Sequence, residues 1–147
     1  MLPQNFHFYE RGWLSSNSLL IQHPEQTVLF DSGYVTHSHQ LLQLLHHDLK
    51  DQPLDMLINS HLHSDHCGGN ALLQNTFASL QTHIPVNQFS TVVAWDTSSL
   101  SFESTGQTCP SFKPTHEINH LQDIKLENSH WVSYSSPGHD NDSLVFF

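Results

Sequence analysis

Apolar positions in the first thirty residues fall in short runs that turn-forming residues separate. The runs cover residues 6–9, 18–21 and 27–30, and the tetrapeptide HPEQ stands between the last two. Short apolar runs joined by turn residues are typical of β-hairpins. The pattern predicts that the chain begins with three antiparallel strands.

The apolar spacing then changes from that of a strand to that of a helix. Leucines at positions 41, 42, 44, 45 and 49 are spaced by threes and fours, with Thr36 or Ser38 as N-cap and Pro53 beyond the end. This spacing predicts a helix of about three turns. LDMLINS (54–60) then predicts a strand, GGNALLQNTFASL (68–80) a helix, and THIPV (82–86) another strand. The alternation indicates an α/β (α+β) domain with a mixed sheet and helices on its outer face.

The last fifty residues are less regular. Residues 97–120 show little periodicity and many turn formers, which predicts a long ordered loop that we expect over the functional site. Strand character returns at 130–135, and a last apolar run begins at Ser143 and ends on Phe147. No polar tail follows that run. We therefore expect residues 1–147 to form a single, incomplete domain whose unpaired C-terminal strand can associate with another chain.

Charge and composition restrict the partners and the compartment. Four Lys and Arg stand against 14 Asp and Glu, a formal charge of -10, which repels phosphate backbones and anionic lipid head groups. We therefore expect a small-molecule substrate, and neither nucleic acid nor a membrane as partner. Two cysteines cannot form a disulfide framework, and the N-terminal segment lacks the basic start and apolar core of a secretion signal. The expected location is the cytoplasm.

The segment HLHSDHCGG at 61–69 carries the strongest chemical signal. In a loop at the end of a strand its side chains can form two sets, with His61 and His63 facing one metal ion and Asp65 with His66 facing a second about 3.5 Å away. Imidazole and carboxylate ligands suit zinc, with iron or manganese as substitutes. A chance match is expected on the order of one per cent of the time, so an exposed polar loop is the weaker interpretation. The glycines at 68 and 69 fit close backbone packing under such a loop.

This segment resembles the metal-binding signature of the metallo-β-lactamase-fold hydrolases, in particular of their glyoxalase II-like branch. VLFDSGY at 28–34 resembles the family's upstream strand-Asp-x-Gly element. SSPGHDNDS at 135–143 resembles the segment that brings in the third histidine of the first metal. The resemblance implies an αββα sandwich of which this chain supplies the N-terminal portion.

The resemblance also implies roles for individual residues. His61, His63 and His139 would hold the first metal, and Asp65 with His66 would contribute to the second. Asp65 would also orient the attacking hydroxide, and Asp31 would support the metal loop by fixing a ligand's orientation. With one or two zinc ions bound, a metal-bound hydroxide would attack a small ester, thioester, lactone or lactam.

One departure from the family pattern leaves an alternative open. In the family a bridging aspartate and a last histidine follow the strand that begins here at Ser143, and this sequence ends at Phe147. The alternative is therefore a metal-binding but catalytically incomplete fragment or module. No G-x-S-x-G element is present, which disfavours a covalent serine mechanism. Cys67 and Cys109 are interpreted as packing residues, and the histidines at 37, 39, 46 and 47 as solvated or capping residues.

Overall fold

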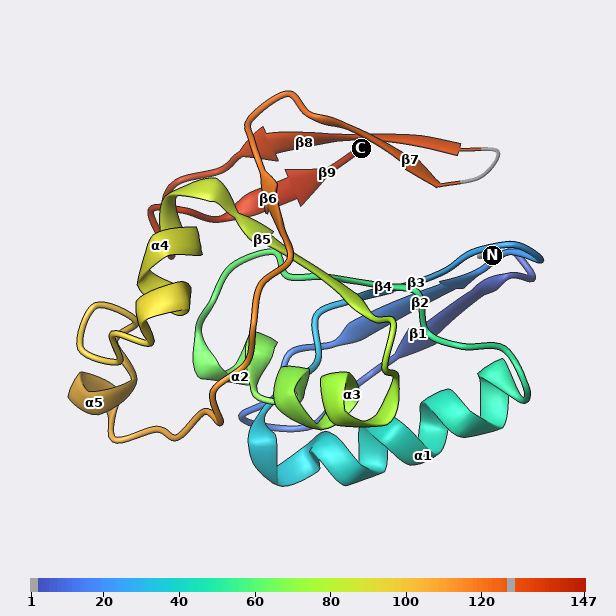
Figure 1. Ribbon diagram of the computed structural model, residues 1–147, viewed down its shortest axis with the longest axis horizontal. Coiled ribbons are helices and arrows are strands. Elements are labelled where there is room, and N and C mark those ends of the chain that lie inside the picture. Colours follow the sequence, from blue (N-terminus) through green and yellow to red (C-terminus); the bar gives the residue numbers. More distant parts are fainter. Residues whose placement is uncertain (1–2, 127–128) are drawn as a thin grey trace.

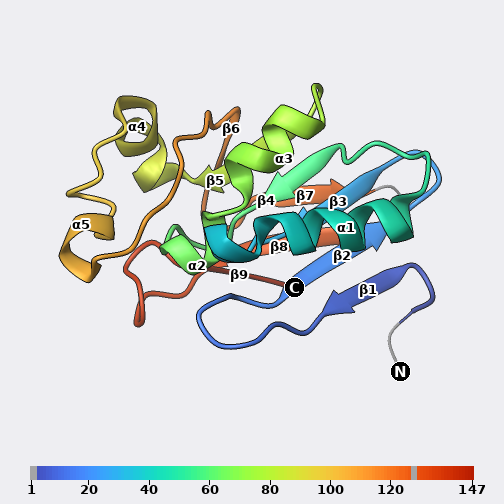
Figure 2. The same cartoon turned by 90° about the horizontal axis from the view of Figure 1, so that it is seen from below.

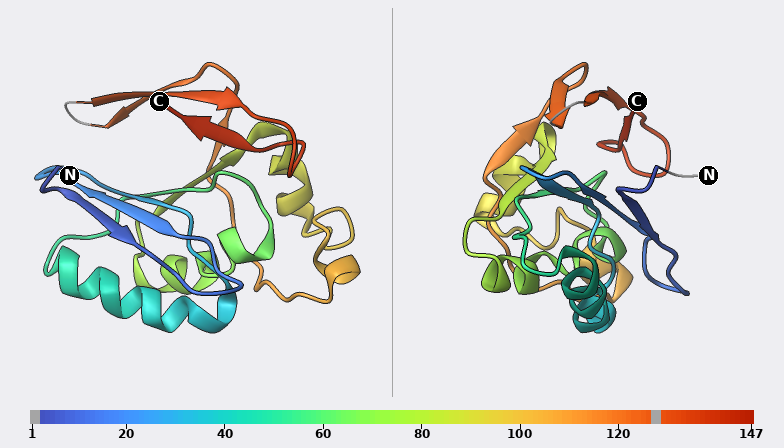
Figure 3. Two further views of the ribbon diagram at one scale, coloured as in Figure 1. Left: turned by 180° about the vertical axis from the view of Figure 1, so that it is seen from behind. Right: turned by 90° about the vertical axis from the view of Figure 1, so that its right-hand side faces the viewer.

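The computed structural model describes residues 3–126 and 129–147, which form two β-sheets with helices around them (Figure 1). The larger sheet contains β1 (Phe6–Tyr9), β2 (Ser18–Gln22), β3 (Thr27–Phe30), β4 (Met56–Ile58), β5 (Gln81–Pro85) and β6 (His116–Ile118), in that spatial order. The smaller sheet contains β7 (Asp123–Leu126), β8 (Ser129–Ser135) and β9 (Leu144–Phe146). It lies across one face of the larger sheet, as the two views in Figure 3 show.

The helices occupy the opposite face and one end of the larger sheet. They are α1 (Ser38–Leu49), α2 (Ser64–Cys67), α3 (Asn70–Thr76), α4 (Val86–Ala94) and α5 (Phe102–Thr105), with a 3-10 turn at Val35–His37. Figure 2 shows α1 and α3 in front of the larger sheet, with β7, β8 and β9 behind it. Among the described residues, no helix has the length and apolar character that crossing a bilayer requires.

The two faces of the larger sheet build two separate cores. Leu29 and Leu57 pack with Leu45 of α1, whereas their chain neighbours Val28 and Ile58 pack between the two sheets. All five side chains are inaccessible to solvent. Successive side chains of a strand point to opposite faces, and burying each aliphatic side chain stabilises the fold by about 1.5–3 kcal/mol. The same short strands therefore hold the helices on one side and the smaller sheet on the other.

The strand directions place the chemical groups at one edge. β1, β2 and β3 pair antiparallel, and β3, β4, β5 and β6 pair parallel. The carboxyl ends of parallel strands meet at the same edge of a sheet. Asp31 directly follows β3, and the histidine-rich segment follows β4. The topology therefore brings these two segments together.

The predicted three strands, the three-turn helix and the mixed sheet are confirmed. The layers match the N-terminal portion of an αββα sandwich, and within the described residues no helix covers the outer face of the smaller sheet. The helix expected at 68–80 is shorter, because Gly68 and Gly69 lie in the turn that precedes α3 and a separate turn, α2, forms just before them.

The expectation of a long loop at 97–120 was wrong in part. This segment contains α5 and β6, each of which is too short to show a period in the sequence. Two further elements were not expected, although their patterns are visible. Val86, Phe89 and Val92 of α4 recur every third residue, and the β7 sequence DIKL alternates polar and apolar positions.

Candidate metal centre

Three imidazoles from two distant segments converge at the carboxyl edge of the larger sheet. His61 and His63 follow β4, and His139 lies in the connection from β8 to β9. One ring nitrogen of each lies within 4.8 Å of the other two. Nδ1 of His63 and Nε2 of His139 are 2.9 Å apart, and the ring centroid of His61 is 4.7 Å from that of His63. The three rings thus surround one point.

The donor set fits a metal ion. His61 is only 6% exposed, and its Nε2 is buried with no hydrogen-bond partner among the residues that the structure describes. A buried polar atom without a partner is destabilising, and a bound cation would satisfy it. Burial, helped by the charge of His66, lowers the pKa of His61 to about 4. The ring is therefore neutral near pH 7, which is the form that binds metals, and three histidines are a known ligand set for catalytic zinc.

Asp65 and His66 lie together beside this group. The His66 ring centroid is 3.9 Å from that of His61, its Nδ1 lies 2.8 Å from Asp31 Oδ2, and its Nε2 lies 3.6 Å from Asp65 Oδ2. Burial alone lowers the pKa of His66, but the hydrogen bond to Asp31 and the charges of Asp31, Asp65 and Asp140 raise it overall. The sequence places the ligands of a second metal at these residues, and that assignment stays a prediction.

Asp31 ties the end of β3 to the histidine-rich segment. Its backbone has the left-handed φ of 55°, and its side chain is turned toward Ser60. The backbone N–H of Ser60 donates to Oδ1 at 2.8 Å, and the hydroxyl of Ser60 donates to Oδ2 at 2.7 Å. The same hydroxyl lies 3.2 Å from Nδ1 of His61. Ser60 was not singled out from the sequence, although its position next to His61 was a signal.

Hydrogen bonds from neighbouring segments hold the backbone of the histidine-rich segment in place. The carbonyl of His66 accepts hydrogen bonds from the backbone N–H of Ser32 at 2.8 Å and from the side-chain amide of Asn59 at 3.0 Å. A Cβ atom on Gly69 would lie 2.6 Å from the carbonyl oxygen of Ser32. The close packing predicted for the glycine pair is therefore confirmed. It fixes α2, which carries Asp65 and His66.

A pocket of about 300 Å³ opens beside the histidines. His63, Asp65 and His139 form one side of it. The other lining residues are Leu14, Ser64, Ser101, Phe102, Thr105 and Gln107. The Ser64 hydroxyl donates a hydrogen bond to Gln107 Oε1, which links α2 to the opposite wall. Residues 101–107 thus lie next to the candidate ligands, where the sequence led us to expect this segment.

Residues 11–147 match the sequence model of the Metallo-beta-lactamase superfamily. The chain belongs to the metallo-β-lactamase superfamily.

Solved structures of metallo-β-lactamases share this fold. They include BJP-1, a subclass B3 enzyme of Bradyrhizobium japonicum (TM-score 0.76, 13% identity), and FEZ-1 from Legionella gormanii (TM-score 0.77, 16% identity). A metallo-β-lactamase from Cronobacter sakazakii has a TM-score of 0.80 and 17% identity. Each match covers 97% of this chain but only 53%, 54% and 56% of the respective solved chain. The chain thus spans about half the length of these metallo-β-lactamases, and the likeness shows the fold.

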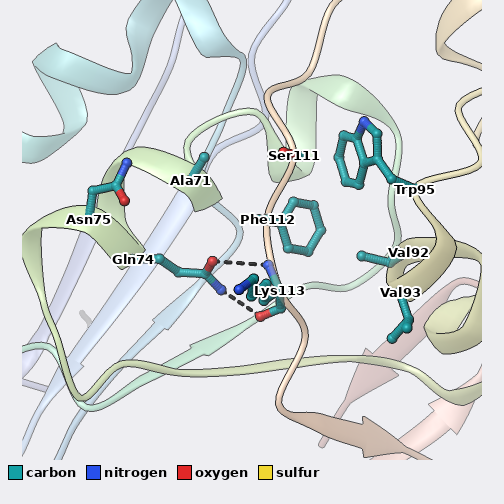
Figure 4. Close-up of a pocket in the computed structure, with 9 residues that line it drawn as sticks. All are labelled: Ala71, Gln74, Asn75, Val92, Val93, Trp95, Ser111, Phe112 and Lys113. Carbon is teal, nitrogen blue, oxygen red and sulfur yellow. Dashed lines mark hydrogen bonds between the residues drawn. The ribbon is translucent and has the colours of Figure 1, made fainter.

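A second hollow of about 500 Å³ lies on another part of this metallo-β-lactamase-type domain, between α3, α4 and residues 111–113 (Figure 4). Gln74 binds the backbone of Lys113 there through two hydrogen bonds, of 2.7 and 3.0 Å. Trp95, Phe112 and Val92 form the apolar side. None of the candidate metal ligands lines this hollow. The smaller pocket beside the histidines is therefore the candidate reaction site.

Proposed function

We propose that this chain belongs to a metal-dependent hydrolase whose zinc site is built on His61, His63 and His139. The observation that carries the proposal is the convergence of these three imidazoles, one of which has a buried nitrogen without a partner among the described residues. One or two zinc ions are proposed, with iron or manganese as substitutes. Asp65 and His66 are the proposed contributors to a second ion.

Each residue has a proposed task around the bound metal. Zinc supplies Lewis-acid polarisation of a carbonyl group and makes bound water more acidic. His61 contributes a neutral imidazole, because its pKa is lowered by burial. Asp31 accepts the Nδ1 proton of His66, so Nε2, the nitrogen on the side of Asp65, is the proposed metal-binding atom of that ring. Asp65 lines the pocket, where its carboxylate can accept a proton from water and orient it.

The pocket favours a small acyl substrate. Its volume of about 300 Å³ has room for a compact group, and its wall combines Leu14 and Phe102 with hydroxyl and amide side chains. Its lining contains no Lys or Arg, and the chain carries a formal charge of -10. We propose an ester, thioester, lactone or lactam. A thioester fits the glyoxalase II-like branch that HLHSDHCGG resembles, and a lactam fits the solved relatives, which are metallo-β-lactamases.

A second candidate function is metal binding without turnover, as a module that a further segment or chain completes. It is favoured by one observation, that the chain spans about half the length of the solved relatives.

Metal content and turnover separate these candidates. The chain is stripped with a chelator, dialysed against zinc, measured by elemental analysis, and assayed on a generic thioester and a generic lactone. We expect one or two zinc ions per chain, and hydrolysis that stops with chelator and returns with zinc. Stoichiometric zinc without hydrolysis would support the second candidate. The absence of stoichiometric zinc would refute both.

The matched control addresses the high histidine content of 14 residues. His61→Ala with His63→Ala should abolish binding at the first site. His46→Ala with His47→Ala removes two exposed imidazoles from α1 and should leave the stoichiometry unchanged. Equal zinc content in the two double variants would contradict the ligand assignment.

A further inference from the structure

The carboxylate of Asp140 lies beside Nε2 of His63, on the side of the ring that faces away from His139. Its Oδ2 lies 3.4 Å from Nε2 of His63, whereas Nδ1 of the same ring lies 2.9 Å from His139 Nε2. The Asp140 side chain is 13% exposed, and its Oδ1 accepts the backbone N–H of Asp142 at 2.7 Å. The two nitrogens of His63 therefore face different groups: Nε2 faces an acid, and Nδ1 faces the other candidate ligands.

A ring nitrogen that faces a carboxylate carries the proton, and the other nitrogen then holds the lone pair. We propose that Asp140 is a positioning residue that keeps Nε2 of His63 protonated and so makes Nδ1 the atom that binds the metal. The inference rests on the proposed metal site and assigns a role that the sequence did not give to Asp140. His63 itself is 28% exposed and lines the pocket.

Asp142 supplies a control within the same connection. Its Oδ1 accepts a hydrogen bond from Nδ2 of Asn87 at 2.9 Å. It carries the same charge two positions away from Asp140. Its substitution therefore tests the general effect of a lost negative charge near the site, separately from the contact with His63.

The informative variant is Asp140→Asn. Asparagine has the same shape, and its carbonyl oxygen can still accept the N–H of Asp142. Its amide then faces Nε2 of His63 as a donor, which favours the ring form with the proton on Nδ1 and no lone pair for the metal. We expect zinc affinity, measured by competition with a chromophoric chelator, to fall about 10–100-fold. Asp142→Asn should keep the affinity of the unsubstituted chain.

Long-range ¹H–¹⁵N NMR spectra of the histidine rings test the same point without any variant. In the zinc-loaded chain we expect zinc on Nδ1 of His63 and a proton on its Nε2. Zinc on Nε2, or an Asp140→Asn affinity equal to that of Asp142→Asn, overturns the inference. If the unsubstituted chain binds no zinc, the proposed function fails. The spectrum of the metal-free chain still decides the role of Asp140, since a proton on Nδ1 of His63 would refute it.

Discussion

Oδ2 of Asp31 lies 2.8 Å from Nδ1 of His66, so a residue at the end of β3 holds a ring that follows β4. The same carboxylate accepts two hydrogen bonds from Ser60. Asp31 is 7% exposed, and its contacts join the two parallel strands at the edge where the candidate ligands lie. One carboxylate therefore fixes the backbone of the histidine-rich segment, orients His66 and raises the pKa of that imidazole.

Asp31→Asn should weaken the site without distorting the backbone, because asparagine tolerates the left-handed conformation. We expect zinc affinity to fall about 10–100-fold, and the pKa of His66 in the metal-free chain to decrease. Because the folded-state pKa of His66 is raised, its pair with Asp31 stabilises the fold below the unfolded pKa of 6.5. That stabilisation is lost as the pH rises through the folded-state pKa. The stability deficit of the variant should therefore be largest in acid.

Asp123→Asn is the control for this experiment. Asp123 also pairs with a histidine, His130, at 3.2 Å, but the two side chains are 49% and 64% exposed. Exposed pairs contribute little to stability, so this substitution should change neither zinc affinity nor the pKa of His66. Chelator competition and an NMR titration of the metal-free proteins measure both quantities. If the pKa of His66 in Asp31→Asn equals that in the unsubstituted chain, the Asp31 carboxylate does not control that pKa.

His83 on β5 should destabilise the metal-free protein in mild acid. It is 8% exposed, and its ring stacks on that of His116 with centroids 4.4 Å apart. Burial, and the nearby His116, lower the pKa of His83 to about 4. Between the unfolded pKa of 6.5 and about 4 the unfolded chain binds a proton that the folded chain does not. The free energy of unfolding therefore decreases as the pH falls from 6.5 to about 4.

His83→Phe keeps a ring in place and removes this titration. We expect the loss of unfolding free energy from pH 6.5 to pH 4, measured by urea unfolding, to be smaller than in the unsubstituted chain. Some loss of unfolding free energy in acid should remain in this variant, because His61 also has a pKa lowered to about 4. His116→Gln should reduce the loss less than His83→Phe, because burial is the larger cause of the shift. If unfolding free energy depends on pH in the same way in His83→Phe and in the unsubstituted chain, His83 does not cause the loss of stability in acid.

The regular parts of the fold could be predicted because local spacing determines them. The alternation of Val28, Leu29 and Phe30 follows the pleat of a strand with a core on each side, and the leucines of α1 follow the turn of a helix. α5 and β6 have too few residues to display a period. The spacing of apolar residues therefore predicts β3 and α1, whereas α5 and β6 carry no such pattern and depend on the contacts they make.

The candidate site likewise contains residues whose proximity the sequence predicts and one contact that it does not predict. His61 and His63 are two positions apart at the end of a predicted strand, so their proximity follows from the local sequence. His139 is 76 residues from His63, and only resemblance to a family brought it into the predicted site. Neither spacing nor resemblance reveals that Asp140 faces Nε2 of His63. That contact depends on how the connection from β8 to β9 folds back over the larger sheet.

Gly68 should not tolerate a side chain. A Cβ atom at this position would lie 2.7 Å from the carbonyl oxygen of Ser64 and 2.9 Å from that of Gly33. Because both neighbours are backbone atoms, α2 would have to move, and Gly68→Ala should cost about 1–3 kcal/mol of unfolding free energy. It should also weaken zinc binding, since α2 carries Asp65.

The control for this substitution lies next to the third histidine. A Cβ on Gly138 would meet no atom within 4 Å, so Gly138→Ala should stay within about 0.5 kcal/mol of the unsubstituted chain. Urea unfolding and chelator competition measure both variants. Equal stability of the two would mean that the contact under Gly68 is not tight.

Cys67 and Cys109 should form a disulfide when the protein is oxidised. Their sulfur atoms are 3.8 Å apart, and a bond requires about 2.05 Å, so a modest approach suffices. Cys67 is fully buried and its pKa is raised by burial, whereas Cys109 is only half-buried. Cys109 should therefore react first.

With glutathione disulfide as oxidant, the Cys109 thiolate attacks one sulfur of the oxidant and releases one glutathione thiol. Cys67 then attacks the mixed disulfide, loses its proton and releases the second glutathione. We expect a product lighter by two hydrogen atoms, with both thiols lost and no glutathione retained, by mass spectrometry. Cys67→Ser should instead keep glutathione on Cys109, and Cys109→Ser should stay unreacted.

Because the new bond joins α2 to the segment that follows the pocket wall, the oxidised chain should melt at a higher temperature than the reduced chain. A mixed disulfide that persists on the unsubstituted chain would show that the two sulfurs do not meet in solution.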